Sequence, residues 1–343
     1  MTKRRFILAA AAATIVAAGV LALYWLWAAG QVRTAIAHWS AAQRAAGYQV
    51  AYDGPEIGGF PVRLAVRLES PRIAAPQGWR WSGAAVTGEA AFWQPLLLRL
   101  ALPRRQELVA VWRGHERRLR LDAGRADGEV RLDGAGQAVA AAVEMFDVTV
   151  REAPGQEAAG WTARAGHMRH EIARQAPSPG QEAHMRLEGT LADLMVVQMP
   201  PPFPDTIDRL AYAADLVGTI PAGEPAAALA AWRDGGGVVQ VSNLTFVWGP
   251  LDVRADGTAA LDEALRPQGA FSARIAGLPE LLDALVAQGG MQPAAAAALR
   301  IAVLTFAEGR DGNGRPIVRV PVTLQDGTVF LGPVAVARLD PVL

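Results

Sequence analysis

An unbroken apolar stretch opens the chain and runs from Phe6 to Trp27 without a charged residue. As a helix, about twenty such residues at about 1.5 Å each cross the ~30 Å hydrocarbon layer of a membrane. The basic tripeptide Lys3 to Arg5 precedes the stretch, and positive charge on that side favours a cytoplasmic N-terminus. The pattern therefore predicts a cytoplasmic basic tip and one transmembrane helix over residues 1–30, with the bulk of the chain outside the cytoplasm.

Three aromatic residues, Tyr24, Trp25 and Trp27, stand where an aromatic belt marks the far membrane interface. A cleaved signal peptide is the alternative, because Ala28 and Ala29 are small enough for a cleavage site. The apolar segment is too long for such a peptide, and the large Trp27 fits its cleavage site poorly. We therefore expect a retained anchor.

The next segment, 31–47, carries apolar residues at helical spacing and ends at Gly47, where a helix stop is expected. We interpret it as an amphipathic stalk that continues the membrane helix outward. Its apolar stripe either covers the following domain or lies on lipid, and we expect the former. Trp39 would then fill part of a core.

Beyond Tyr48 the apolar period changes from helical to two. Between Phe60 and Leu68 every second residue is apolar, and the pattern returns near Met185 and Val318. One-sided alternation is typical of antiparallel strands with one wet face. Asp-Gly pairs suit tight turns, and they begin at Asp53, Asp127, Asp133, Asp256, Asp311 and Asp326.

Helical patterns interrupt the strands at 225–232, after Pro279 and near Pro293, and a strand is expected from Val238 to Trp248. A proline cluster marks an internal boundary, at Pro200, Pro201, Pro202 and Pro204. We therefore predict a mainly β fold with a few helices (α+β), in which a large curved antiparallel sheet follows the transmembrane helix. Its two β-rich halves are 48–199 and 205–343, the second with covering helices, and the sequence leaves open whether they share one sheet.

Composition restricts the function classes. About half of the residues (51%) are apolar and 19% are charged, which is typical of a folded chain. The formal net charge is +0 and no basic stripe interleaves with aromatics, so nucleic acid is not an expected partner. The chain has 0 cysteines, which excludes disulfides, thiolate metal sites and cysteine nucleophiles.

The residue types that common reaction centres need are also missing. Lys3 is the sole lysine, so a P-loop, a Ser-x-x-Lys site and a Schiff-base site in the folded part are excluded, and no serine stands in Gly-x-Ser-x-Gly. His167, His170 and Glu171, with His184 on a neighbouring strand, are a candidate zinc set. The alternative, which we favour, is that these histidines belong to a polar strand face. We expect no catalytic residue, no metal and no cofactor.

The positive signal is aromatic and apolar, since 10 tryptophans are spread over the chain. Trp79 and Trp81 face the same side of a strand. The ordinary explanation is a packed core. The functional alternative is a curved sheet whose apolar face holds an acyl chain, and the candidate ligand face is Phe60, Val62, Leu64, Trp79 and Trp81.

Short motifs spread over both halves resemble a bacterial family of unknown function, domain-of-unknown-function family 2125. They are Gly59-Phe60-Pro61, Gly78-Trp79-Arg80-Trp81, Trp93-Gln94-Pro95, Trp248-Gly249-Pro250, Leu261-Asp262, Arg266-Pro267-Gln268-Gly269 and Leu331-Gly332-Pro333. The resemblance implies a membrane-anchored protein of the bacterial envelope with no assigned activity, and it carries over no catalytic residues. The passage from Leu261 to Gly269 also resembles repeats of the AsmA-like envelope proteins, which form long lipid-conducting sheets.

These observations predict a single-pass protein of the bacterial inner membrane, with its N-terminus in the cytoplasm and its β domain in the periplasm. We expect it to bind lipid or another hydrophobic ligand without catalysis. The alternative is an interaction module that docks onto another envelope protein through a sheet edge or an apolar patch.

Overall fold

A computed structural model gives the fold, and it describes residues 2–76, 78–112, 115–153, 161–175, 184–196, 203–221 and 224–342. Within these ranges, side chains are described except at 2–13, 17, 112, 115, 184 and 196. The side chains of the basic tip and the residues Pro200 to Pro202 thus lie outside the described part. The elements begin with a 44-residue helix, α1 (Thr2–Ala45).

Nineteen strands and three further helices follow α1 in the described chain. The strands up to the middle of the chain are β1 (Gln49–Gly58), β2 (Arg63–Ala74), β3 (Arg80–Gly83), β4 (Ala85–Ala91), β5 (Gln94–Ala101), β6 (Arg105–Trp112), β7 (His115–Asp122), β8 (Arg125–Leu132), β9 (Ala138–Glu152), β10 (Thr162–Gln175) and β11 (His184–Val196). The remaining elements are β12 (Thr206–Val217), α2 (Pro225–Asp234), β13 (Val238–Trp248), β14 (Leu251–Leu261), β15 (Pro267–Ala276), α3 (Leu278–Ala287), α4 (Pro293–Thr305), β16 (Ala307–Arg310), β17 (Pro316–Gln325), β18 (Thr328–Leu331) and β19 (Val334–Arg338).

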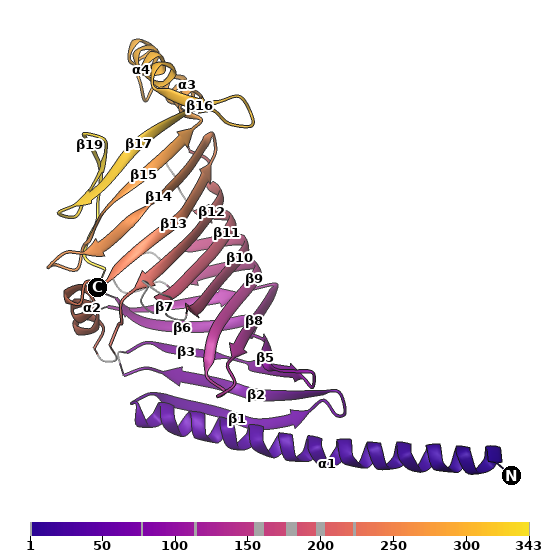
Figure 1. Cartoon of the computed structure of the whole chain (residues 1–343). Helices are drawn as coiled ribbons and strands as arrows, with labels where there is room; N and C mark the ends of the chain where they lie inside the picture. Colours follow the sequence, from indigo (N-terminus) through magenta and orange to yellow (C-terminus); the bar gives the residue numbers. More distant parts are fainter. Residues whose placement is uncertain are drawn as a thin grey trace.

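All strands belong to one sheet, and neighbouring strands pair antiparallel (Figure 1). The short strands β3 and β4 lie end to end against β2, and β5 with β6 and β7 with β8 repeat this arrangement. From β9 onward, single long strands pair in chain order up to β15, which pairs with β17. The predicted fold class, mainly β with a few helices, is confirmed. Since β11 pairs with β12, strands on both sides of the proline cluster share the sheet.

Helix α1 lies along β1 with its C-terminal part and projects past the sheet with its N-terminal part (Figure 1). Ala29 and Ser40 are buried on the face toward the domain. The segment 31–45 thus covers the edge of the sheet, as the stalk interpretation expects. Trp39 does not fill a core, since it is 45% exposed and lies about a quarter turn from the face that carries Ala29 and Ser40.

A crease crosses the sheet where single residues adopt left-handed backbone. Asp147 (φ 52°) on β9 and Asp193 (φ 53°) on β11 lie inside strands at this line. Gly124 and Gly166 face them, and a Cβ at either glycine would lie 3.0 Å from the aspartate Oδ2. At the crease, the alternation of buried and exposed side chains along the strand shifts by one residue. Met145 before Asp147 and Val148 after it therefore belong to the same buried apolar cluster, although they are three residues apart.

The three short helices begin within one residue of the predicted starts at Pro225, Pro279 and Pro293. Glu224 caps α2, and its carboxylate accepts from the N–H groups of Ala226 (3.2 Å) and Ala227 (2.8 Å). Trp232 in α2 is buried, and its Nε1 donates to the Val217 carbonyl at 2.8 Å. In Figure 1, α2 lies beside the strand ends, and α3 and α4 lie at the end of the sheet beyond β15 and β17.

Two expectations about turns and strands need correction. Asp53, Asp127 and Asp256, each with its following glycine, lie inside strands and not at turns. At Gly257 the neighbouring strand comes so close that a Cβ would lie 2.3 Å from the Ala270 carbonyl oxygen, so the glycine serves packing. Asp133, Asp311 and Asp326 do stand at turns.

The expected strand from Phe60 is also too long at its start. Phe60 and Val62 belong to the tip between β1 and β2, because the Arg63 N–H donates back to the Gly59 carbonyl (3.1 Å) and closes a turn. Gly59 has φ 95°, a conformation that suits glycine. The strand β2 therefore begins at Arg63.

The crease predicts how position 147 tolerates substitution. Asp147→Gly should leave the free energy of unfolding within a few tenths of a kcal/mol, whereas Asp147→Val should lower it by about 1–2 kcal/mol, because a β-branched residue is strained at positive φ. Thermal or urea unfolding measures both variants. Equal losses for glycine and valine would contradict the left-handed conformation.

Candidate functional site

One face of the sheet carries rows of apolar side chains that cross it from strand to strand. One long row of directly paired residues runs from β2 to β17. Its members are Val66, Gly88, Leu100, Gly128, Val143, His170, Gly189, Tyr212, Leu244, Ala255, Ala273 and Val320. Eleven steps at about 4.8 Å make it about 53 Å long. We call this side of the sheet the apolar face.

Two flanking rows are apolar at every position. The first runs through Ala126, Met145, Met168, Leu191, Leu210, Phe246, Val253, Ile275 and Val318. The second runs through Leu98, Val130, Ala141, Ile172, Leu187, Ala214, Val241, Gly257, Phe271 and Val322. Strand alternation places these residues on the side of the first row, so together they form a continuous apolar band.

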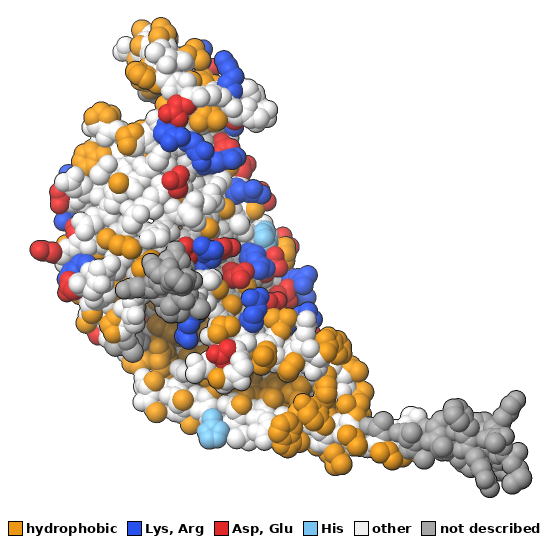
Figure 2. Space-filling view, in the orientation of Figure 1, with side chains coloured by type: hydrophobic (Ala, Val, Ile, Leu, Met, Phe, Trp, Pro, Cys, Tyr) orange, Lys and Arg blue, Asp and Glu red, His pale blue; other side chains and the backbone are white. Residues whose placement is uncertain are grey.

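The opposite side of the sheet is charged. Arg186 on β11 forms a bidentate pair with Asp215 on β12, with both N–O distances 2.9 Å. Arg169 pairs with Glu171 along β10 (3.1 Å), and these side chains are solvated. In Figure 2 the charged side chains gather over the middle and upper strands. On this face, neighbouring side chains thus pair their charges within a strand and between strands.

The apolar face is only partly covered. Among the described residues no large side chain is fully buried, and Ile172, in the middle of the band, is 40% exposed. The accessible surface is 21134 Å², against about 13,400 Å² for a compact protein of this mass. The projecting helix contributes to the excess, and so does a sheet whose helix contacts fall mainly on β1 and β17.

A cavity of about 640 Å³ lies between the C-terminal end of α1 and strands β1, β2, β3, β6 and β7. Trp81, Val50 and Ile73 are among its apolar lining residues. Its charged lining residues are Arg44, Arg72, Arg80, Arg118 and Glu107. Cations outnumber the carboxylate, so the cavity combines apolar surface with positive charge.

One polar pair interrupts the first of the three rows. His170 Nδ1 and the Tyr212 hydroxyl are 2.8 Å apart and meet across Gly189, where a Cβ would lie 2.5 Å from the tyrosine ring. Burial lowers the pKa of the His170 imidazole, so it is neutral at pH 7. The contact gives His170 Nδ1 and the Tyr212 hydroxyl each a hydrogen-bond partner.

The structure separates the five residues of the predicted ligand face. Phe60 and Val62 lie at the β1–β2 tip, and Leu64 starts the apolar face on β2. Trp81 pairs with Ile73 nine residues further along β2, about 30 Å away, and donates its Nε1–H to Gln106 (2.9 Å). Trp79 packs on Tyr48, with ring centroids 6.3 Å apart. The ligand face itself stays a prediction.

The candidate zinc set does not assemble in the described part of the chain. His167 Nε2 lies 2.9 Å from the Glu144 carboxylate on the charged side, whereas His170 stands on the apolar face. Glu171 pairs with Arg169, and the side chain of His184 lies outside the described residues. Among the described side chains no group of three potential ligands comes together.

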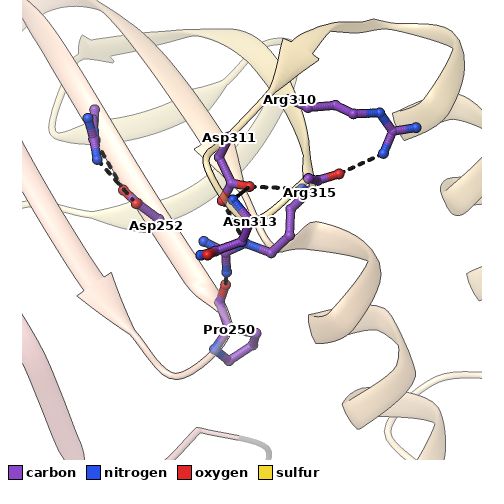
Figure 3. A network of polar contacts seen from close by, with 8 residues as sticks. Pro250, Asp252, Arg310, Asp311, Asn313 and Arg315 are labelled. Atoms are coloured by element: carbon purple, nitrogen blue, oxygen red, sulfur yellow. Dashed lines mark hydrogen bonds and ion pairs between the residues drawn. The ribbon is translucent and has the colours of Figure 1, made fainter.

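A repeated polar turn looks like a site but is structural. Asp311 accepts from the N–H groups of Asn313 (2.9 Å) and Arg315 (2.8 Å) and from the Arg315 Nε (2.7 Å), and Arg315 reaches the Pro250 carbonyl (2.7 Å; Figure 3). Desolvation raises the pKa of the Asp311 carboxyl, but the hydrogen bonds from Arg315 and Asn313 and the charge of Arg315 together outweigh it, so the pKa lies below its ordinary value. Asp262 and Arg266 repeat the arrangement at the β14–β15 turn. The aspartates are thus turn clamps, and the Leu261–Asp262 motif has a local role.

Sequence reasoning missed most of the apolar band. Met168, Leu191, Leu210 and Phe246 carried no motif. Their signal is an apolar alternation that recurs in every strand and shifts by one residue at the crease.

The polar pair gives a testable prediction. Tyr212→Phe should lower the free energy of unfolding by about 1 kcal/mol, because it removes a half-buried hydrogen bond to His170. Tyr52→Phe is the control, since the Tyr52 hydroxyl has no hydrogen bond in the described part of the chain.

In an NMR titration the His170 pKa should lie below 6.5. Because a neutral imidazole is favoured in the fold, stability should fall as pH drops below the unfolded-state pKa of about 6.5. An unshifted or raised pKa would contradict the burial.

Comparison with known proteins adds a family. No curated protein and no solved structure matches the chain, so the resemblance to AsmA-like proteins gains no support from them. The family model described as "Uncharacterized protein conserved in bacteria (DUF2125)" matches residues 25–340, nearly the whole chain. The chain therefore belongs to this bacterial family of uncharacterised proteins.

Proposed function

We propose that this protein is anchored in the bacterial inner membrane by α1 and binds the acyl chains of a lipid on the apolar face of its periplasmic sheet, without catalysis, in cell-envelope maintenance. The observation that carries the proposal is the apolar band, about 53 Å long, that the described helices leave largely uncovered. Exposed apolar surface of this extent marks a binding surface. Each methylene group of an acyl chain that is buried against this surface contributes about 0.8 kcal/mol to the binding free energy.

Anchoring by α1 is supported by composition and exposure. Within the described residues, one helix is long and apolar enough to cross a membrane. In its candidate span, Thr14–Ala45, the most apolar part of the helix is almost entirely exposed. The cations Lys3 to Arg5 favour the N-terminus in the cytoplasm, and this orientation supports a periplasmic location for the sheet. The cavity beside Trp81, with its four arginines, suits a ligand with an anionic headgroup.

Photocrosslinking in cells tests the proposal on the full chain. A photoreactive side chain at Ile172, exposed on the apolar face, should capture lipid, and mass spectrometry identifies the adduct. The same group at Thr258, exposed on the charged side, is the control. Lipid adducts at both positions or at neither would overturn lipid binding by the apolar face.

A matched pair of substitutions sharpens the test. Ala141 faces Ile172 on the apolar face, and Ala142 faces Glu171 on the charged side. Ala141→Lys should reduce the lipid adduct at Ile172 at least about tenfold, because a desolvated ammonium costs more than the 1.4 kcal/mol that tenfold represents. Ala142→Lys, which falls between Glu129 and Glu171, should leave the adduct unchanged. Equal losses in both variants would contradict binding at this face.

An interaction module is the second candidate. The strand β19 ends the chain of pairings, and its Val334 and Val336 are 58% and 55% exposed. An edge strand with exposed valines offers backbone groups to a partner strand. A photoreactive group at Val336 that captures one defined envelope protein would favour this candidate.

A further inference from the structure

Two hairpin tips beside α1 expose large apolar side chains. At the β1–β2 tip, Phe60 is 53% and Val62 is 56% exposed. At the β4–β5 tip, Trp93 is 73% exposed, and Phe92 and Leu96 are also exposed. Figure 2 shows apolar side chains gathered at this end of the domain, next to the projecting helix. Such a patch on a folded domain marks an interaction surface.

The tips are fixed to one level of α1 by aromatic contacts. Tyr24 packs edge-on against Phe92, with ring centroids 4.7 Å apart, and Trp25 packs edge-on against Phe60 at 5.8 Å. The Trp25 Nε1–H also donates to the Arg63 carbonyl at 3.1 Å. These contacts hold both hairpins at the height of Tyr24 and Trp25.

That height coincides with the end of the membrane-spanning part of α1. The residues from Phe6 to Leu23 form an apolar helix of about 27 Å at 1.5 Å per residue, close to the ~30 Å hydrocarbon thickness. Tyr24 and Trp25 therefore stand at the interface, where amphipathic aromatic rings are most stable. The two tips share this level, so their exposed side chains meet the lipid boundary.

The polarity around the tips has the gradient of an interface. A cavity of about 430 Å³ between the hairpins is lined by Phe60, Val62 and Trp93 at the tips. Further from the tips its lining includes Arg63 and Glu89, which form an ion pair at 3.1 Å. The cavity is thus apolar where acyl chains would lie and charged where headgroups would lie.

We propose that the β1–β2 and β4–β5 tips insert into the interfacial layer of the membrane that α1 crosses, with Phe60 and Trp93 as anchors. The partner is the phospholipid bilayer, and the inference rests on the anchoring by α1 proposed above. Val62, Phe92 and Leu96 continue the alternation of Leu64, Ala90 and Leu98, so the apolar face opens at the bilayer. Lipid has a continuous apolar route from the membrane to the sheet.

Site-directed spin labelling tests the insertion on the full chain in phosphatidylcholine nanodiscs. The chain has 0 cysteines, so single cysteines at Phe60 and Trp93 label one site each. Val336→Cys is a control, because Val336 is as exposed as Phe60 but lies on the end strand β19. Labels at 60 and 93 should collide several times more with oxygen than with a water-soluble nickel complex, and the label at 336 should show the reverse.

A fourth label at Val16, 64% exposed on α1, separates the two proposals. An apolar signal at 16 with aqueous signals at 60 and 93 would overturn the insertion of the tips and keep the anchor. An aqueous signal at 16 would overturn both. Melting temperatures of the cysteine variants within a few degrees of the unlabelled chain show that the labels report the native fold.

Discussion

The structure depends on one constraint: a single-layer sheet needs an apolar residue at every second position of every strand, on the same side. The paired row from Ala126 to Val318 meets this requirement from β8 to β17. The crease adds a second condition on the sequence. At Asp147 and Asp193 the apolar positions must shift by one residue along the strand, so that apolar side chains stay on the same side of the sheet before and after the crease. A sheet built this way presents one apolar surface that short helices at its ends cannot cover, and the remaining features follow from what meets that surface.

Much of the fold could be predicted from the sequence, since strands and helices have distinct periods. The strand from Val238 to Trp248 and the helices that begin near Pro225, Pro279 and Pro293 appear as expected. The failures share a cause, which is that a residue type has more than one use. Glycine after Asp127 or Asp256 looks like a turn, yet at Gly257 it lets a neighbouring backbone approach.

The candidate site was harder to predict because it is defined by pairing and not by motif. Met168, Leu191 and Leu210 are unremarkable in the chain, and only the register of β10, β11 and β12 places them side by side. Phe60 and Trp81 have stronger sequence signals, but Phe60 serves a hairpin tip and Trp81 a cavity. His167 and His170 stand three residues apart in one strand. Because side chains alternate between the two faces of a strand, these histidines lie on opposite sides of the sheet and cannot bind one metal ion together.

Helix α1 links the constraint on the sheet to the proposed membrane anchor. An unpaired edge strand attracts other strands, and α1 lies along β1 at the end where the sheet begins. Tyr24 and Trp25 of the same helix contact the β1–β2 and β4–β5 tips, so one element both lies along the edge strand and holds the two tips. With the anchoring proposed for α1, the apolar rows start beside the bilayer and extend away from it strand by strand. The apolar face would then open toward lipid at the β1–β2 and β4–β5 tips, where the same helix contacts the sheet.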